Sequence, residues 1–400
     1  MRLENDEVPS PMKKSVCRGS SAAIAAAFTV VIALYTWKKR NNQNKQSKVK
    51  SNNAAYTSRI GSTPMVELRS LSKLVGCRIL AKVEYSNPGG TGKDRIALAM
   101  IEEAERNGSL RENGTIVEGT SGSTGISLSA LAAARGYKCI IVMPDDQAPE
   151  KRLLMESYGS KVHVVKTAAI ANPNHYVNVA QRIASDLPGA VFMNQFETLA
   201  NFRAHVRSTG PEIWRGAGGR IDAFIMAAGT GGTIAGVSRY LKTRSEGRTL
   251  VVLADPPGSS LYHYVKNKVC WNVGQTERNL RMHRYDTIAE GIGLDRVTAN
   301  LALADIDDAV AVTDQQAIDT AHHLLRHEGL FVGSSSAVNV AATIDFCSRA
   351  NLPSDAVVVT VLCDSGHRHT SRFWCREKAV KKFGLNWPCD SAADINSNSK

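Results

Sequence analysis

Aromatic side chains are scarce in this sequence, at 6% of its 400 residues, and its eight cysteines form no Cys-x-x-Cys pair. Without that spacing the chain has neither a zinc-ribbon site nor a thioredoxin-type redox motif, and we expect no bound metal. Several cysteines, Cys139 and Cys363 among them, lie in apolar runs typical of strands. This placement favours buried thiols in a reducing compartment over disulfides.

The body of the chain also lacks an excess of one charge. The formal net charge is +12, but residues 1–18, 38–50 and 372–400 together carry about +10 of it, which leaves about +2 for residues 51–371. A nearly neutral body is not typical of a protein that binds the phosphates of nucleic acid, so we expect no nucleic-acid partner. Apolar residues make up 43% of the chain and charged residues 22%, which excludes disorder throughout. The length allows about two domains.

Residues 19–37, GSSAAIAAAFTVVIALYTW, carry no charge. A membrane-spanning helix needs about 20 apolar residues, so this run is just long enough. Tyr35 and Trp37 lie at one end of it, where interfacial aromatic residues belong, and a lysine-rich segment follows. The run therefore predicts an uncleaved signal anchor, with an N-terminal tail of residues 1–18 before it and a basic linker of residues 38–55 after it.

Other interpretations of this run are weaker. A cleaved secretory signal would have a clear small-residue cleavage site, and a matrix transit peptide would lack the acidic Glu4, Asp6 and Glu7. A buried N-terminal helix is a third alternative. Basic residues are in excess on the C-terminal side of the run, which predicts a cytosolic body. A short span between basic flanks resembles signal anchors of the mitochondrial outer membrane, so we expect a single-pass protein there, with the endoplasmic reticulum membrane as the alternative.

From residue 56 onward, short apolar runs alternate with amphipathic stretches. Residues 78–85 are typical of a strand, and the apolar residues of 94–108 recur at helical spacing. Continuous apolar runs such as DAFIMAAG, TLVVLADP and AVVVTVLCD indicate strands that helices cover on both faces. The alternation predicts an α/β body with parallel sheets over residues 56–385, followed by a disordered tail of residues 386–400.

Four loops between these elements carry polar residues suited to chemistry. Residues 87–95 (NPGGTGKDR) place Lys93 at a helix start, where the dipole favours the neutral, nucleophilic amine, although an ordinary surface lysine would fit as well. Residues 120–125 (TSGSTG) suit a carboxylate or a simple helix cap. Residues 229–233 (GTGGT) suit a phosphate but lack the dinucleotide and P-loop spacings. Ser365 follows the last strand, where α/β sheets bind ligands, or caps a helix.

A lysine nucleophile, a carboxylate loop, a phosphate loop and a strand-end hydroxyl point to a single cofactor. Pyridoxal 5'-phosphate is an aldehyde that carries one phosphate and a pyridine nitrogen, and aldehydes form Schiff bases with lysine. The sequence therefore predicts pyridoxal 5'-phosphate as the cofactor.

The same segments resemble the fold-type II pyridoxal-phosphate enzymes, and within them the cysteine synthase (O-acetylserine sulfhydrylase) and cystathionine β-synthase family. Residues 87–95 match N-P-x-x-S-x-K-D-R, residues 120–125 match T-S-G-N-T-G, and residues 208–214 match T-T-G-P-E-I-W. Further matches are residues 60–66 with I-G-x-T-P-L-V, residues 195–196 with Q-F, residues 229–233 with the phosphate loop and residues 290–293 with E-G-I-G. Within this family, the chain most resembles the fungal cysteine synthase-like proteins that are anchored in the mitochondrial outer membrane.

This resemblance implies a tryptophan synthase β-like fold of two interleaved parallel-sheet α/β subdomains, the smaller at about residues 95–200, in a homodimer. It implies that Lys93 forms the Schiff base and is the catalytic base. It assigns cofactor contacts to Lys93, Ser123, Gly229, Thr230, Gly231, Gly232, Thr233 and Ser365, and substrate contacts to Thr120, Ser121, Gly122, Thr124, Gln195 and Gly291.

The implied activity is a β-replacement on small-molecule substrates. O-acetyl-L-serine loses acetate, and sulfide adds to the resulting α-aminoacrylate to give L-cysteine. The alternatives are a cysteine desulfhydrase or serine β-lyase, which would use the same residues, and a non-catalytic membrane-anchored scaffold that binds the cofactor. Three positions depart from the family pattern: Ser123 replaces an asparagine, residues 198–201 (TLAN) replace N-P-A-N, and residues 366–369 (GHRH) replace G-E-R-Y.

Overall fold

The structure is a computed structural model of the chain, and it describes residues 55–271 and 287–388. The predicted anchor at residues 19–37 lies outside the described residues, as do residues 389–400 of the predicted tail. Within the described ranges, no helix has both the length and the apolar character that crossing a membrane requires.

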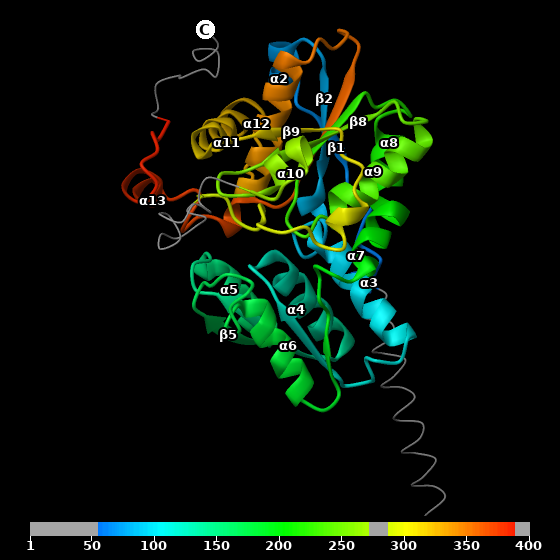
Figure 1. Cartoon of the computed structure of the whole chain (residues 1–400), viewed down its shortest axis with the longest axis vertical. Coiled ribbons are helices and arrows are strands. Elements are labelled where there is room, and N and C mark those ends of the chain that lie inside the picture. Colours follow the sequence, from blue (N-terminus) through cyan, green and yellow to red (C-terminus); the bar gives the residue numbers. More distant parts are fainter. Residues whose placement is uncertain (1–54, 272–286, 389–400) are drawn as a thin grey trace, which may run out of the picture. The chain divides into compact units, whose positions relative to one another are not determined.

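Strands and helices alternate along the described chain, as the sequence predicts (Figure 1). The strands are β1 (Met65–Glu67), β2 (Arg78–Val83), β3 (Thr115–Gly119), β4 (Lys138–Pro144), β5 (Lys161–Val165), β6 (Ala190–Phe192), β7 (Ala223–Ala227), β8 (Leu250–Asp255), β9 (Asp308–Ala311) and β10 (Val357–Leu362). The α-helices are α2 (Arg69–Val75), α3 (Lys93–Arg106), α4 (Ser123–Arg135), α5 (Pro149–Ser157), α6 (Tyr176–Asp186), α7 (Leu199–Ala204), α8 (Gly210–Gly216), α9 (Gly232–Arg244), α10 (Leu261–Asn267), α11 (Asp314–His327), α12 (Ser334–Arg349) and α13 (Arg376–Lys381). Shorter helical turns are η1 (Glu84–Ser86), η2 (His205–Thr209), η5 (Leu301–Leu303) and η6 (Gly366–Arg368). The predicted strand at 78–85 is β2 and the predicted helix at 94–108 is α3, so both are confirmed.

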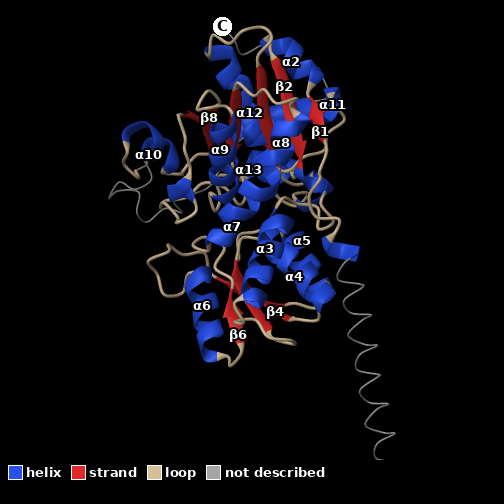
Figure 2. Ribbon diagram, turned by 90° about the vertical axis from the view of Figure 1, so that its right-hand side faces the viewer, coloured by secondary structure: helices blue, strands red, loops and turns tan. Residues whose placement is uncertain are grey.

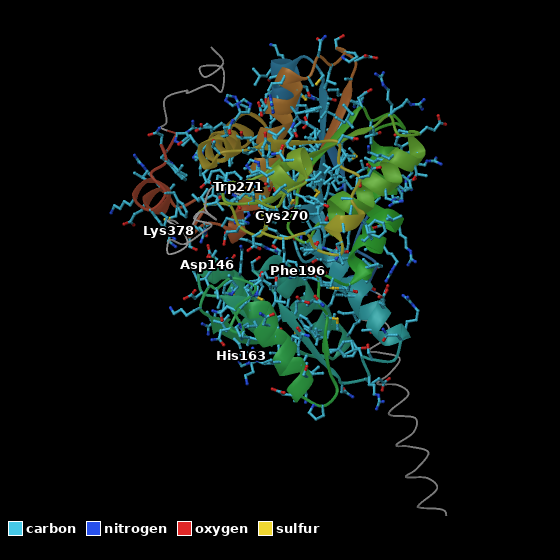
Figure 3. The ribbon with its side chains drawn as sticks, viewed as in Figure 1. Asp146, His163, Phe196, Cys270, Trp271 and Lys378 are labelled. Atoms are coloured by element: carbon cyan, nitrogen blue, oxygen red, sulfur yellow. The ribbon has the colours of Figure 1, made fainter. Side chains whose placement is uncertain are left out.

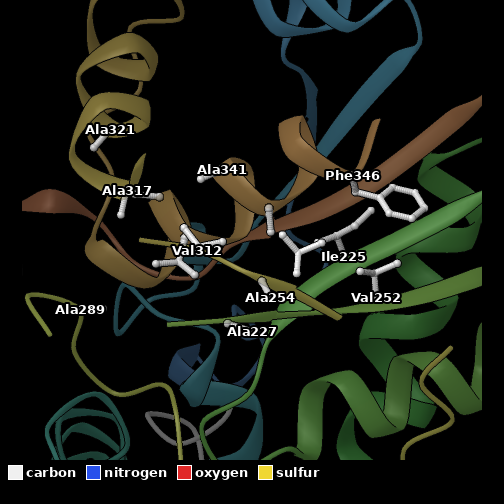
Figure 4. Packing of buried hydrophobic residues seen from close by; sticks show 14 of the residues in the cluster. Ile225, Ala227, Val252, Ala254, Ala289, Val312, Ala317, Ala321, Ala341 and Phe346 are labelled. Atoms are coloured by element: carbon white, nitrogen blue, oxygen red, sulfur yellow. The ribbon is translucent and has the colours of Figure 1, made fainter. Parts of the chain in front are cut away.

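The larger sheet has six strands in the order β1-β2-β10-β7-β8-β9, and its neighbours are parallel except for β1 and β2. Successive side chains of a strand point to opposite faces. In β7, Ile225 packs on the face that α11 and α12 cover, whereas Phe224 and Met226 pack on the face of α8 and α9. Figure 4 shows the first of these contacts. Helices on both faces explain why β7, β8 and β10 read as continuous apolar runs.

The smaller sheet has four parallel strands in the order β5-β4-β3-β6 (Figure 2). Ile116 of β3 and Ile141 of β4 pack with α3 and α4 on one face, and Val117 and Val142 pack with α6 on the other. The chain enters this part at α3 and leaves it after β6, so both sheets contribute loops that follow the carboxyl ends of parallel strands. In α/β sheets such loops form the ligand site.

A buried ion cluster ties α3 to the larger sheet. Arg95 of α3 donates from Nε to Glu84 Oε2 at 2.7 Å and from Nη2 to Glu212 Oε2 at 2.7 Å. Lys82 of β2 lies 2.8 Å from the same Glu212 oxygen. The side chains of Arg95 and Glu84 are each only 2% exposed, so their charges depend on one another for stabilisation.

Candidate active site

Lys93 is the first residue of α3, and it lines a cavity of about 260 Å³. The turn before it is held against the end of β10, because the N–H of Gly92 donates to the carbonyl of Cys363 at 3.2 Å. The next residue, Asp94, accepts a hydrogen bond from Ser127 Oγ at 2.6 Å. Burial raises the pKa of Asp94 to about 6, although its hydrogen bonds oppose this rise. The backbone and the first turn of α3 therefore fix the place of Lys93 in the cavity.

The cavity brings together most of the site residues that the resemblance implies. Those that line it are Lys93, Thr120, Ser121, Ser123, Thr124, Gln195, Gly229, Thr230, Gly231, Thr233 and Gly291. Gly122, Gly232 and Ser365 are not in its lining. Two further lining residues, Asp146 and Phe196, are labelled in Figure 3 at the edge of the smaller sheet that faces the larger one.

The loop from Gly229 to Thr233 leads from β7 into α9 and has the geometry of an anion cradle. Gly231 has a φ of 81°, in the left-handed region that favours glycine. A Cβ on Gly232 would lie 2.0 Å from Asn201 Oδ1, and one on Gly229 would lie 2.3 Å from the carbonyl oxygen of Gly291. The first turn of α9 has no acidic side chain, so its N-terminal amides are suited to a phosphate.

Asn201 of α7 supports this cradle through hydrogen bonds, and the sequence motifs did not predict a role for it. Its Nδ2 donates to Thr230 Oγ1 at 2.8 Å and to the carbonyl of Gln195 at 3.0 Å. Thr233 Oγ1 is in turn 3.0 Å from Nε2 of the buried His205. Asn201 is the last residue of the TLAN segment, and it is the one position there that keeps the asparagine of N-P-A-N. The retained asparagine was the feature of the sequence that could have indicated this role.

The loop between β3 and α4 is braced by Gln195. Thr124 Oγ1 donates to Gln195 Oε1 at 2.5 Å, and Gln195 Nε2 donates to the carbonyl of Gly119 at 3.1 Å. Within the loop, Thr120 Oγ1 accepts from the N–H of Gly122 at 3.1 Å. These bonds hold the hydroxyl-rich loop against the cavity, where it is able to bind a carboxylate.

Four buried charged residues form what we call the wall cluster: Lys151, Glu290, Asp364 and His369. Lys151 Nζ is 3.0 Å from Glu290 Oε1, and Glu290 Oε2 is 2.8 Å from His369 Nδ1. His369 Nε2 is 3.0 Å from Asp364 Oδ2. None of the four side chains is more than 6% exposed, and Lys151, Glu290 and Asp364 line the cavity.

Three members of the wall cluster, Glu290, Asp364 and His369, favour one another's charged forms. Burial acts to raise the pKa of both carboxyls, but the cations beside them prevail, so the pKa values of Glu290 and Asp364 are lowered. For His369, burial acts to lower the pKa, but Asp364 and Glu290 outweigh it and the pKa is raised. Sequence reasoning missed Lys151 and the joint role of this group, because its members come from separate segments.

The cluster predicts a pH-dependent contribution to stability. The raised pKa of His369 gives a contribution that is complete below about pH 6.5, the ordinary histidine value, and is lost as pH rises through the folded-state pKa. The lowered pKa of Asp364 gives one that is present above about pH 4 and is lost as pH falls through the folded-state pKa. We expect His369→Phe to lower the free energy of unfolding by about 3 kcal/mol at pH 5.5, and by less at pH 9.

Urea denaturation at both pH values measures this difference. The matched control is His327→Phe, because His327 is an exposed histidine of α11. The control is expected to stay within about 0.5 kcal/mol of the unsubstituted chain at both pH values. A loss that is larger at pH 9 than at pH 5.5 would contradict the assigned charges.

The resemblance implies a cofactor contact for Ser365, the hydroxyl at the end of β10, and the structure places it outside the residues that line the cavity. Ser365 is half-buried outside the cavity lining, and its Oγ lies 2.6 Å from His367 Nδ1 while it caps η6. Ser335, in the first turn of α12, lines the cavity beside Cys363. Burial raises the pKa of the Cys363 thiol to about 11, so it stays protonated. The three consecutive serines of Ser334–Ser336, which begin the apolar helix α12, were the sequence signal for this second hydroxyl.

Comparison with known proteins adds independent findings. The model of the family described as "Pyridoxal-phosphate dependent enzyme" matches residues 56–364. "Cysteine synthase 2" of Schizosaccharomyces pombe is 48% identical over 334 residues, which cover 81% of this chain and 84% of the relative. "Putative mitochondrial cysteine synthase" of Saccharomyces cerevisiae is 46% identical over 331 residues, 80% of this chain and 84% of the relative. The crystal structure of an O-ureido-L-serine synthase is 31% identical, with a TM-score of 0.68, over 80% of this chain and 93% of that one.

Proposed function

The chain belongs to the family of pyridoxal-phosphate dependent enzymes, and from this premise we propose that it is a cysteine synthase, which forms L-cysteine from O-acetyl-L-serine and sulfide. The observation that carries the proposal is that one cavity is lined by Lys93, by four residues of the cradle (Gly229, Thr230, Gly231 and Thr233) and by four of the hydroxyl-rich loop (Thr120, Ser121, Ser123 and Thr124). An amine, an anion cradle and a carboxylate site are the three parts that this reaction needs.

The residues present fit pyridoxal 5'-phosphate. Gly229 and Gly232 let the loop pack closely on the Gly291 carbonyl and on Asn201, and the amides at the start of α9, with no acidic side chain beside them, are the donors that would bind a phosphate. Lys93 is the amine that lines the same cavity and would hold the aldehyde. When bound, the cofactor supplies an electron sink for the negative charge that develops at the substrate Cα.

The chain's own residues supply the proton transfers and the orientation. Lys93, once its amine is free, takes the proton from the substrate Cα and returns it at the end of the reaction. Thr120, Ser121, Thr124 and Gln195 orient the substrate by its carboxylate, since Gln195 already fixes the Thr124 hydroxyl. The backbone of Gly291 packs on the cradle at Gly229 and closes this side of the cavity. We propose that Ser335, rather than Ser365, would supply a hydroxyl to the cofactor, because Ser335 lines the cavity.

The experiment that tests the activity is spectroscopic. We expect O-acetyl-L-serine, added without sulfide to the cofactor-loaded enzyme, to shift the visible absorbance to longer wavelength. Sulfide should then reverse the shift and yield one cysteine per site. Steady release of pyruvate without a lasting shift would instead indicate a desulfhydrase or β-lyase. No response to O-acetylserine, serine or cysteine would leave the non-catalytic scaffold as the better account.

We propose that residues 19–37 anchor the enzyme in the mitochondrial outer membrane with its catalytic body in the cytosol. The support is the uncharged run, its terminal Tyr35 and Trp37, and the basic residues that follow. The resemblance also supports a homodimer, which sedimentation of the purified enzyme would test.

Deletion of residues 1–40 tests the anchor. We expect the deleted chain to remain in the supernatant after membranes are pelleted and to keep its bound cofactor, because the deletion leaves every described element intact. The control deletes residues 1–18 and keeps the uncharged run, and it should pellet with the outer-membrane fraction. A chain that lacks residues 1–40 and still pellets would disprove the anchor, and pelleting of the control with endoplasmic reticulum would disprove the location.

A further inference from the structure

Two departures from the family pattern meet on one carboxylate. Ser123, which replaces an asparagine, lies with its Oγ 3.4 Å from Asp364 Oδ2. His369, which replaces a tyrosine, lies with its Nε2 3.0 Å from the same oxygen. The two replaced residues are 246 positions apart in sequence, yet they share one acceptor atom.

We propose that Ser123, Asp364 and His369 act as one unit, in which His369 is a positioning residue that orients Ser123 in the cofactor site through Asp364. This inference rests on the cofactor site proposed above. In the unit, His369 fixes the carboxylate, and the carboxylate accepts the hydroxyl hydrogen of Ser123. The oxygen lone pairs of Ser123 are then left to face the cavity that Ser123 lines.

The position of His369 is fixed by the ring nitrogen that does not contact Asp364. Its Nδ1 is 2.8 Å from Glu290 Oε2, and Glu290 is itself paired with Lys151. The imidazole is therefore held between two carboxylates that belong to different segments, and it is 1% exposed. A ring fixed at both nitrogens cannot turn without breaking a buried charge-assisted bond.

Asp364 needs this support because one of its oxygens is unsatisfied. Oδ1 is buried and has no hydrogen-bond partner among the described residues. A Cβ on Gly333 would lie 2.3 Å from that oxygen and 2.6 Å from His369 Nε2, so the start of α12 packs directly on the pair. The charged groups that act on this carboxylate are His369, Lys151 and Arg368. Without His369, the carboxylate would lose its nearest cation and the bond that sets its rotation.

The arrangement is not that of a serine nucleophile. In a nucleophilic triad the serine bonds to the imidazole, which takes its proton. Here the hydroxyl of Ser123 bonds to Asp364, and the imidazole lies on the other side of the carboxylate. A carboxylate with a lowered pKa is a poor base, so the unit orients the hydroxyl and does not activate it.

The test is a double-mutant cycle in the full-length holoenzyme. Ser123→Asn and His369→Tyr restore the family residues one at a time and then together. Each single variant is expected to lower kcat by about 10-fold or more, and the double variant to recover to within about 5-fold of the starting enzyme. His327→Tyr is the control, since it makes the same change at an exposed histidine of α11. Losses that simply multiply in the double variant would overturn the unit.

A pH titration of the visible absorbance of the bound cofactor separates positioning from mere structure. His369→Tyr should move the titration midpoint by about one pH unit or more, and Ser123→Asn in the same chain should move it back. Asp364→Asn is the second probe, because it is isosteric and removes the shared charge. In that background the Ser123→Asn and His369→Tyr effects should become additive. An unmoved midpoint in His369→Tyr, or coupling that survives Asp364→Asn, would refute the inference.

Denaturation of the cofactor-free protein makes the outcome independent of the proposed activity. The unfolding equilibrium constant of the same four chains should show about 10-fold non-additivity between the two positions. Additive values would overturn the unit even if the enzyme makes cysteine. If the unfolding constants are non-additive but the chain binds no pyridoxal phosphate, the coupling of Ser123 to His369 is supported and the proposed cysteine synthase function is rejected.

Discussion

Lys93→Ala is expected to abolish cysteine formation, with a fall in kcat of about 10⁴-fold or more, and to remove the visible absorbance of the bound cofactor. Lys93 carries two roles, since its amine holds the cofactor and also moves the proton at the substrate Cα. The other lysine in the cavity lining, Lys151, is not a substitute, because its ammonium is held 3.0 Å from Glu290. Absorption spectra and cysteine yield measure the two roles separately.

Two controls sharpen this experiment. Lys93→Arg keeps a long basic side chain at the start of α3 but cannot form an imine, so it should be as inactive as the alanine variant. Lys138→Ala changes an exposed lysine of β4 and should leave both readouts unchanged. A visible band that persists in Lys93→Ala would show that a different amine holds the cofactor.

Local pattern was enough to predict the strands and the functional loops. Residues 223–227 and 357–362 are strands with both faces covered, so every side chain along them is buried. Such a strand appears in the sequence as an uninterrupted run of apolar residues. The loops that follow them, including the one that ends at Lys93, are marked by glycines and small hydroxyl residues. Both signals depend on neighbours along the chain, which the sequence displays directly.

The wall cluster could not be predicted in the same way. Its pairs join Lys151 to Glu290 and Glu290 to His369, across 139 and 79 positions, and no periodicity links them. Lys151 looks like any other charge of an amphipathic helix until Gly122, before α4, and Glu290 are placed beside it. Tertiary packing decides which charges become partners.

Ser335, the hydroxyl that lines the cavity beside Cys363, shows a second limit of prediction from sequence. Ser365 was the natural candidate, because it follows the last strand and corresponds to the family's serine, although residues 366–369 depart from G-E-R-Y. In the structure Ser365 turns to cap η6 and bonds to His367, and α12 brings Ser335 to the cavity instead. Chain order places a residue at an end of a sheet, but side-chain direction depends on the local turn.

Arg95→Met is expected to lower the free energy of unfolding by about 3–5 kcal/mol at neutral pH. Arg95 is the cation that Glu84 and Glu212 share, and the Arg95 and Glu84 side chains are 2% exposed. Burial acts to raise the pKa of Glu212, but Arg95 and Lys82 prevail and lower it to about 2. Methionine fills similar space without a charge, so the loss comes from carboxylates left buried without their partner.

The pH dependence of the stability loss, and a control at an exposed ion pair, make the Arg95→Met prediction specific. The lowered pKa of Glu212 stabilises the fold above about pH 4.5, and that contribution is lost as pH falls through the folded-state value. The penalty of Arg95→Met, measured by urea denaturation, should therefore be smaller at pH 3.5 than at pH 7. Arg78→Met, which removes an exposed pair with Glu67 at 3.0 Å, should cost no more than about 1 kcal/mol. Equal losses for the two arginine variants at pH 7 would mean that the buried cluster contributes nothing beyond an ordinary surface ion pair, and that apolar packing alone holds α3 against the larger sheet.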